Sequence, residues 1–293
     1  MGSRNKIVKD KGKSIRAKLL NLSKASPYDY NIMLSRYVQE RMLYRLSQSK
    51  YKEQFILKGG ALLYAHYQVK SRPTLDVDFL IKNMSNDKEH IKNVLKEVLS
   101  IECPDDALTF DVENITAEDI MEEKTYHGVR IGVKGMIDGM SQPLSIDVGF
   151  GDVTVPAPQE LTYPIILGDM TEFCVNAYSL GTVIAEKFHT MIILSFFNSR
   201  MKDFYDVYSI LSSGNYDKEV LGDAIRSTFL NRHTPYSENH LLFTDEFFLD
   251  STKNKQWSSF LSKIKYKGSL PFVEVGRLIR EILKPYWDSL GFK

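Results

Sequence analysis

The sequence has little cysteine and no metal-binding cysteine or histidine pattern, which excludes two classes of small stabilised domain. Only two of its 293 residues are cysteines, Cys103 and Cys174, and their separation matches no metal or redox motif. We therefore expect reduced thiols rather than a disulfide framework. The six histidines are scattered and form no HExxH pattern, which argues against a structural zinc site.

Excess charge and long hydrophobic runs are also absent. The 38 Lys and Arg residues nearly balance the 37 Asp and Glu residues, so any contact with nucleic acid must come from a local basic patch. The strongest apolar run, residues 190–197, is too short to span a bilayer. The charged amino-terminal stretch lacks the apolar core of a signal peptide. We therefore expect a cytoplasmic protein with no membrane partner.

Hydrophobic periodicity predicts an α+β fold. A mixed β-sheet flanked by helices is expected over residues 1–175, and a helical lobe over residues 176–293. The expected helices before residue 101 cover 14–50, with a start at Ser26 and Pro27, then 61–69 and 85–100, the last beginning near Asn86 or Asp87. The expected strands cover 54–57, 75–81, 108–115, 127–137 and 144–153, and a proline-rich loop covers 155–165.

Two aspartates interrupt the predicted strand at residues 75–81. Aspartate is a poor strand former, and a buried carboxylate is costly unless something pairs with it. Side chains two residues apart share one face of a strand, about 6.5–7 Å apart, so Asp76 and Asp78 point the same way. The apolar residues expected to face the core are Leu75, Val77 and Phe79. Two carboxylates at this spacing suit a pair of Mg²⁺ ions about 3.5–4 Å apart.

Two further features complete a possible nucleotide site. Asp147 alternates with apolar residues on a later strand, so it offers a third carboxylate as a metal ligand or as a proton acceptor. Lys58, Gly59 and Gly60 follow a short strand and open a helix, where backbone N–H groups favour an anion such as a triphosphate. Each feature alone also suits a surface acid pair or a simple turn. Their order along the chain makes the combination specific.

In this order the motifs resemble the DNA polymerase β-like nucleotidyltransferase superfamily, and more closely the AbiEii/AbiGii toxins of abortive-infection toxin–antitoxin systems. The resemblance covers roughly residues 35–210. It implies a nucleotidyltransferase-like sheet followed by a helical lobe. The implied metal ligands are Asp76, Asp78 and Asp147. The implied catalytic residues are Asp76, Asp78, Asp147, Lys187 and Asp206, and the implied nucleotide-binding residues are Lys58, Gly59, Gly60, Arg72, Thr74 and Asp203.

The sequence departs from the broad superfamily pattern at the glycine turn. Gly60 stands where many members have serine, so that hydroxyl is not available to hold a phosphate. The gap between Gly60 and Asp76 is also longer than in the simplest members. Arg72, which precedes the acidic strand, either binds phosphate or braces the loop.

Three charged residues of the helical lobe have two interpretations. Asp203 and Asp206 lie off the apolar stripe of their helix, so we expect them to face solvent or a cleft. Lys187, on the preceding helix, offers a point charge for phosphate oxygens. Solvated charges or an ion pair between helices would give the same pattern. The resemblance favours a functional role for Lys187 and for at least one of the two aspartates.

Near the carboxyl end, lysines alternate with aromatic residues over residues 253–267. Such a mixture suits phosphate contacts and base stacking in RNA, but core aromatics with solvated lysines would look the same. The residues are Lys253, Lys255, Lys263, Lys265, Lys267, Trp257, Phe260 and Tyr266.

Together these features predict a Mg²⁺-dependent nucleotidyltransferase that moves an NMP from an NTP to an acceptor hydroxyl. Asp147 would help to deprotonate the acceptor, and Lys187 would offset the charge that grows during transfer. By resemblance, the acceptor is the 3′ end of tRNA, GTP or CTP is the first nucleotide to try, and the protein is a growth-arresting toxin in phage defence with a separately encoded antitoxin. The alternatives are modification of a protein or small molecule, and a nucleotide-binding module without catalysis.

Overall fold

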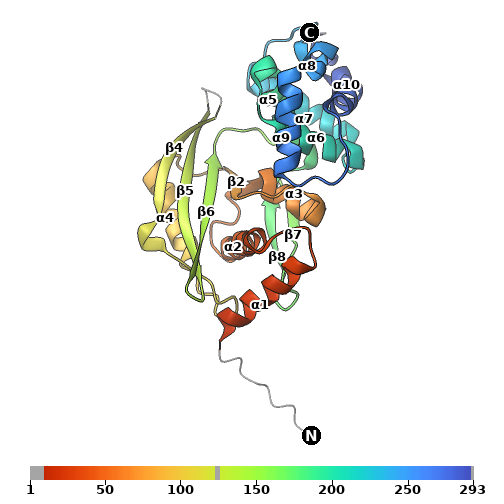
Figure 1. The fold of residues 1–293 in the computed structure, drawn as a ribbon. Coiled ribbons are helices and arrows are strands. Elements are labelled where there is room, and N and C mark those ends of the chain that lie inside the picture. The colour runs from red at the N-terminus through yellow and green to blue at the C-terminus, as the bar shows by residue number, and fades with distance from the viewer. Residues whose placement is uncertain (1–9, 123–125, 292–293) are drawn as a thin grey trace. The chain divides into compact units, whose positions relative to one another are not determined.

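In the computed structural model, which describes residues 10–122 and 126–291, the chain forms two compact units (Figure 1). The first comprises Met1–Gly151 and Glu160–Ala177, and the second comprises Asp152–Gln159 and Tyr178–Lys293. Residues 1–9, part of the stretch from which the absence of a signal peptide is predicted, lie outside the described residues.

The first unit is built on a mixed sheet, which in the described residues has eight strands in the order β3-β5-β6-β2-β1-β8-β7, with β4 paired to β5. The strands are β1 (Phe55–Lys58), β2 (Asp76–Ile81), β3 (Thr109–Phe110), β4 (Thr116–Glu122), β5 (Tyr126–Ile137), β6 (Met140–Gly149), β7 (Gln159–Tyr163) and β8 (Phe173–Ala177). β2 runs antiparallel to β1 and parallel to β6, and β6 runs antiparallel to β5. The predicted α+β fold class is confirmed.

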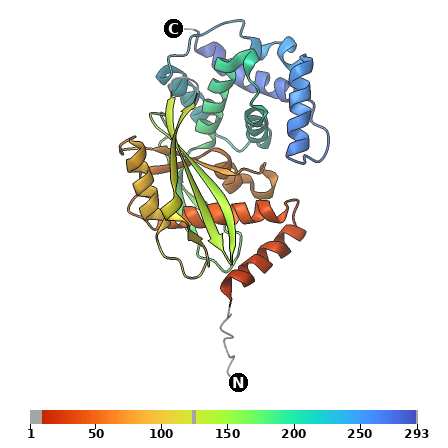
Figure 2. The same ribbon diagram turned by 60° about the vertical axis from the view of Figure 1, so that its left-hand side comes forward.

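Four helices of the described residues belong to the same unit. They are α1 (Lys11–Lys24), α2 (Tyr30–Ser47), α3 (Gly59–Tyr67) and α4 (Lys88–Leu99). α2 packs against β6 and α4, while α4 packs against β4 and β5 (Figure 2). Asp87 caps α4 as predicted, because its carboxylate accepts the N–H of His90 at 2.8 Å.

The predicted helix start at Ser26 and Pro27 is wrong. α1 ends at Lys24 and α2 begins only at Tyr30, because Asp29 is the residue whose carboxylate accepts the N–H of Ile32, at 3.1 Å. Pro27 lies in the turn between the two helices.

Several expectations about the strands also need correction. Over residues 108–115, only Thr109–Phe110 is a strand, and a 3₁₀ turn follows at Val112–Asn114. The expected loop at 155–165 contains β7, which lies at the sheet edge where flanking prolines are tolerated. β4 and β8 were not predicted. Leu75, expected in the core, is 63% exposed because it precedes β2, whereas Val77 and Phe79 are fully buried.

The second unit is helical. Its helices are α5 (Leu180–Leu194), α6 (Met201–Ser213), α7 (Lys218–Asn231), α8 (Asp245–Leu249), α9 (Ser251–Lys263) and α10 (Phe272–Ser289). The segment Leu180–Phe197 is long and apolar enough to cross a membrane, but 61% of it is buried inside the protein. Such burial is typical of the core helix of a globular unit. Aromatic rings, among them Phe204, Phe247 and Trp257, fill much of this core.

Candidate functional site

A row of charged side chains crosses four neighbouring strands of the sheet. Lys58 on β1 is paired in register with Asp78 on β2, and Asp78 is paired with Asp147 on β6. Asp147 is paired in turn with Arg130 on β5. Partners across a ladder project to the same face, and Asp76 joins them because it lies two residues before Asp78. The structure thus brings all three predicted carboxylates and Lys58 to one face.

Gly59 is the point where the glycine turn meets the acidic strand. Its φ of +66° lies in the left-handed region, which side chains other than glycine rarely adopt. A Cβ built there would lie 1.9 Å from Oδ2 of Asp78 and 2.9 Å from its Cβ. The carboxylate of Asp78 therefore packs directly on the backbone of the turn, and only glycine leaves room for it.

Gly60 is constrained by Thr74 in the same way. A Cβ at Gly60 would lie 2.7 Å from both Cβ and Oγ1 of Thr74. A serine here would collide with that side chain, which explains the departure from the superfamily pattern. The hydroxyl of Thr74, which donates to the carbonyl of Asp76 at 3.3 Å, lies next to the place that a serine side chain would occupy.

Lys58 adds a cation to the same face. A Cβ on Gly149 would lie 3.4 Å from Nζ of Lys58, so the ammonium reaches across to the end of β6. Lys58 also immediately precedes α3, whose first N–H groups have no intrahelical acceptor. A helix N-terminus beside an ammonium attracts anions, and phosphate oxygens suit both.

Arg130 is the residue that the sequence interpretation missed. Its Nε and Nη2 donate to the two oxygens of Asp147 at 2.7 and 2.6 Å, a bidentate ion pair. These hydrogen bonds raise the pKa of Arg130 well above its usual value, and the charges of Asp76 and Asp78 raise it further. Alternation in residues 127–137 places Arg130 on the exposed face of its strand, but the pairing with Asp147 depends on a register between strands that one sequence does not specify.

The carboxylates can hold a divalent cation. In the described residues, no three His, Cys, Asp or Glu side chains are grouped closely enough to form a complete metal site. Asp76 and Asp78 share one face of β2, while Asp147 is paired with Arg130. Mg²⁺ is commonly bound by one or two carboxylates together with substrate phosphates, so this pair of oxygen donors suits it.

Arg72 makes a contact within its own loop. Its Nη1 donates to the carbonyl of Pro73 at 3.4 Å. This bond supports the bracing interpretation, and the guanidinium is half-buried rather than enclosed.

In the helical unit, Lys187 forms ion pairs with two aspartates of α6. Its Nζ lies 2.6 Å from Oδ1 of Asp203 and 2.9 Å from Oδ2 of Asp206. Arg200 also contacts Asp203, at 2.7 Å. The expectation that both aspartates face solvent or a cleft is wrong, because they are only 1% and 2% exposed. A stripe pattern on one helix cannot show that the neighbouring helix supplies a lysine.

The charges of this cluster offset the cost of its burial. Burial alone would raise the pKa of Asp203, but the positive charges of Lys187 and Arg200 outweigh it and lower that pKa to about 2. Asp203 is therefore ionised at neutral pH, and the contacts of Lys187 with Asp203 and Asp206 tie α5 to α6.

Lys253 does not belong to an RNA-binding surface. It is 3% exposed, and its Nζ donates to the carbonyls of Phe196 and Asn198 at 2.7 and 3.1 Å. Trp257 is also buried, with its Nε1 donating to the carbonyl of Leu270. These residues join α9 to the core. Only exposed lysines of this segment, such as Lys255, can contact RNA.

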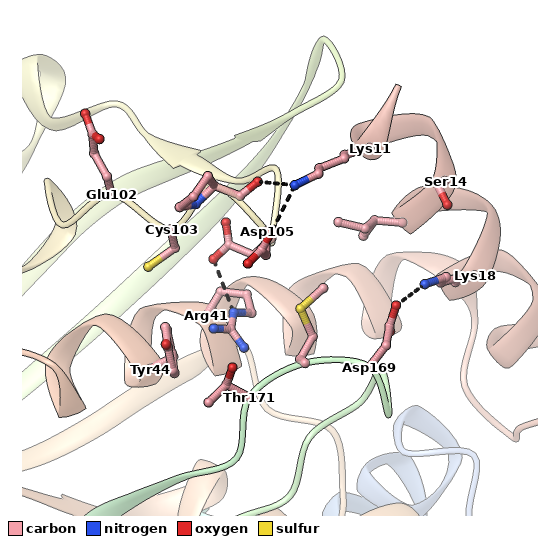
Figure 3. Close-up of a pocket in the computed structure, with 14 residues that line it drawn as sticks. Lys11, Ser14, Lys18, Arg41, Tyr44, Glu102, Cys103, Asp105, Asp169 and Thr171 are labelled. Carbon is pink, nitrogen blue, oxygen red and sulfur yellow. Dashed lines mark hydrogen bonds and ion pairs between the residues drawn. The ribbon is translucent and has the colours of Figure 1, made fainter. Parts of the chain in front are cut away.

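A separate cavity of about 460 Å³ lies in the first unit between α1, α2 and the loops at 102–106 and 169–171 (Figure 3). Its charged rim is held by ion pairs from Lys11 to Asp105 and from Lys18 to Asp169, while the buried Arg41 contacts Asp106. None of the predicted site residues lines it.

The chain resembles known proteins both in sequence, through a family model, and in fold, through solved structures. The family model described as nucleotidyl transferase AbiEii toxin, type IV TA system, matches residues 41–289. A solved structure described as a candidate nucleotidyltransferase from Helicobacter pylori aligns at 12% identity and a TM-score of 0.49, over 90% of this chain and 98% of that one. JHP933 from Helicobacter pylori aligns at 13% identity and a TM-score of 0.45, over 89% and 96%. At these values neither structure supports an inference about the site. None of the curated proteins compared with the sequence matches it.

Proposed function

The chain belongs to the AbiEii family of nucleotidyl transferase toxins of type IV toxin–antitoxin systems, and on that premise we propose that it transfers an NMP from an NTP to the 3′ end of a tRNA. Family membership makes it a nucleotidyltransferase toxin with an NTP substrate and a separate antitoxin. The tRNA acceptor, the use of Mg²⁺, a cytoplasmic location and a role in abortive infection and phage defence are our proposals. GTP and CTP are the nucleotides to try first.

The observation that carries the proposal is the packing of Asp78 on the glycine turn, within the row that contains Lys58 and Asp147. This contact supports a site in which ligands for a cation lie beside groups that donate hydrogen bonds to phosphate. Asp76 and Asp78, with Asp147 as the third ligand, would hold Mg²⁺, which when bound supplies positive charge to the phosphate oxygens and orients them.

The triphosphate would lie against the start of α3. Lys58 contributes its ammonium, Gly59 and Gly60 contribute backbone N–H groups, and Thr74 contributes a hydroxyl in place of the missing serine. Arg72, which braces the adjoining loop, would also add a charged contact to the phosphates. These donors would fix the leaving pyrophosphate and expose the α-phosphorus to the acceptor.

Asp147 would accept the proton of the acceptor hydroxyl. The bond between the hydroxyl oxygen and the α-phosphorus forms, and the bond from the α-phosphorus to the bridging oxygen breaks, so the electron pair leaves with pyrophosphate. The pairing of Asp147 in register with Asp78 supports this role. Ser145 Oγ lies 3.5 Å from Oδ1 of the same carboxylate.

In the helical unit we propose that Lys187 offsets the negative charge that grows during transfer. Asp203 and Asp206 hold its ammonium in place, and Asp206 is our choice as the functional acid of the two. Asp203 would contribute to nucleotide binding through the position it gives to Lys187.

The acceptor can be tested with each α-³²P-labelled NTP, Mg²⁺ and total tRNA. We expect label on tRNA, and no label on tRNA whose 3′ ribose has been oxidised with periodate, because that treatment removes the acceptor hydroxyls. Label on the protein itself would instead favour modification of a protein. Clear NTP binding without transfer to any acceptor would contradict the enzymatic proposal.

A further inference from the structure

The ion pair between Arg130 and Asp147 joins a half-exposed arginine side chain to a mostly buried carboxylate. The side chain of Arg130 is 45% exposed, whereas that of Asp147 is 12% exposed. Arg130 nevertheless engages both carboxylate oxygens of Asp147 with good geometry. A half-exposed guanidinium can therefore leave this carboxylate without opening a cavity in the core.

A second carboxylate lies on the other side of Arg130. In the antiparallel pairing of β4 with β5, Glu118 is directly opposite Arg130, and it is exposed. Side chains opposite each other in such a ladder have Cβ atoms about 4.5–5.5 Å apart and share a face. Among the described residues Arg130 forms its ion pair with Asp147 and none with Glu118. Arg130 thus lies between two acids and pairs with the inner one.

We propose that Arg130 is a positioning residue that holds Asp147 away from the metal site until a divalent cation binds, and that its guanidinium then moves to Glu118. The inference rests on the proposed function, because Asp147 is the third carboxylate of the proposed transfer site. It assigns a role to Arg130 and Glu118, two residues outside the motifs from which the activity was predicted.

Electrostatics gives the reason for such an exchange. Asp76, Asp78 and Asp147 share one face, and like charges at this distance repel unless a cation lies among them. Before a metal binds, Arg130 supplies that positive charge to Asp147, while Lys58 adds a second cation on the same face beside Asp78. A bound divalent cation supplies more, so it competes with Arg130 for the oxygens of Asp147. Glu118 provides the released guanidinium with another partner and thereby lowers the cost of its release.

The test is the affinity of the full-length protein for Mn²⁺ without nucleotide, measured by EPR titration of free Mn²⁺. Arg130→Ala removes the competing cation, so we expect Mn²⁺ to bind about three- to tenfold more tightly, the range for losing a charge-assisted ion pair. Arg130→Lys keeps the charge but not the bidentate contact, and it should fall between the wild type and Arg130→Ala. Lys134→Ala, which removes an exposed cation from the same face of β5, is the matched control and should leave the affinity unchanged.

A double-mutant cycle separates the exchange from simple loss of nearby charge. Glu118→Gln should weaken Mn²⁺ binding in the wild-type background and have no effect in the Arg130→Ala background, because it acts through Arg130. An equal effect of Glu118→Gln in both backgrounds would overturn the exchange. Unchanged or weaker Mn²⁺ binding by a folded Arg130→Ala variant would overturn the positioning role. Because the titration uses no NTP, its result is independent of whether the chain transfers a nucleotide to tRNA.

Discussion

Gly59 links backbone conformation to the candidate site at the scale of a single residue. We expect Gly59→Ala to be destabilised by about 1–2 kcal/mol from its left-handed φ, and by about 1–3 kcal/mol more from the collision with Asp78. The variant should also lose nucleotide transfer, because the displaced carboxylate is a proposed metal ligand. Urea unfolding followed by far-UV circular dichroism measures the first effect, and an assay of labelled nucleotide transfer measures the second.

The matched control is Gly139→Ala. Gly139 has a φ of +72°, but a Cβ there would have no atom within 4 Å. This control therefore has the backbone cost without the collision and should keep full transfer activity. Equal stability and equal activity of the two variants would contradict a special contact at Gly59.

Thr74 provides a second prediction at this scale. Thr74→Val keeps the shape of the side chain that packs on Gly60 but removes its hydroxyl. We expect the KM for the NTP to rise about tenfold or more, since one hydrogen bond to a charged group is worth about 1.5–3 kcal/mol. Thr74→Ser, which restores the hydroxyl, should return KM toward the wild-type value. An unchanged KM for Thr74→Val would exclude a phosphate contact by this hydroxyl.

Sequence analysis identified the residues whose positions follow from their near neighbours in the chain. Asp76 and Asp78 were predicted to share a face because the strand repeats every two residues, and Gly59 with Gly60 signalled a turn. Arg130 was missed because its importance comes from a partner on another strand. The burial of Asp203 and Asp206 was missed for the same reason, since the compensating Lys187 lies on a different helix.

At the scale of elements, the ion pairs between α5 and α6 predict how the helical unit responds to acid. The pKa of Asp203 falls from an ordinary 3.8 to about 2 in the folded protein. A depressed carboxylate pKa stabilises the fold above about pH 4, and this contribution, about 2 kcal/mol, is lost as the pH falls toward 2. We expect Asp203→Asn to be less stable at neutral pH but to lose about 2 kcal/mol less than the wild type between pH 5 and pH 2.

Tryptophan fluorescence reports this unit selectively, because the two tryptophans of the chain, Trp257 and Trp287, both lie in it. Urea unfolding at each pH gives the free energies to be compared. Asp223→Asn, which changes an exposed aspartate of α7, should keep the pH dependence of the wild type. The same dependence in Asp203→Asn would show that the ion pair with Lys187 does not govern acid stability.

The sheet shows where prediction of elements succeeds and fails. β2, α3 and α4 were predicted because their periodicity and caps lie within a few residues of sequence. β7 was missed because Pro156, Pro158 and Pro164 suggested a loop, whereas an edge strand between prolines needs fewer ladder hydrogen bonds. The order of the strands, which places Asp147 beside Asp78, depends on pairings between distant segments.

At the scale of the whole molecule, a sheet-based unit carries the acidic row and a helical unit carries the lysine-centred cluster. The family match extends across both, from residue 41 to residue 289. We propose that the activity of the complete chain depends on the acidic row as a metal-dependent transfer site.

The most direct test is nucleotide transfer by the full-length protein with an Asp78→Asn substitution. With labelled NTP, Mg²⁺ and tRNA, we expect transfer to fall about a hundredfold or more, because loss of a metal ligand removes several kcal/mol of charge stabilisation. Asp119→Asn, which changes an exposed aspartate on β4 that pairs with Lys88, should keep wild-type activity. Wild-type transfer by Asp78→Asn, or transfer that persists when EDTA has removed divalent cations, would contradict the claim.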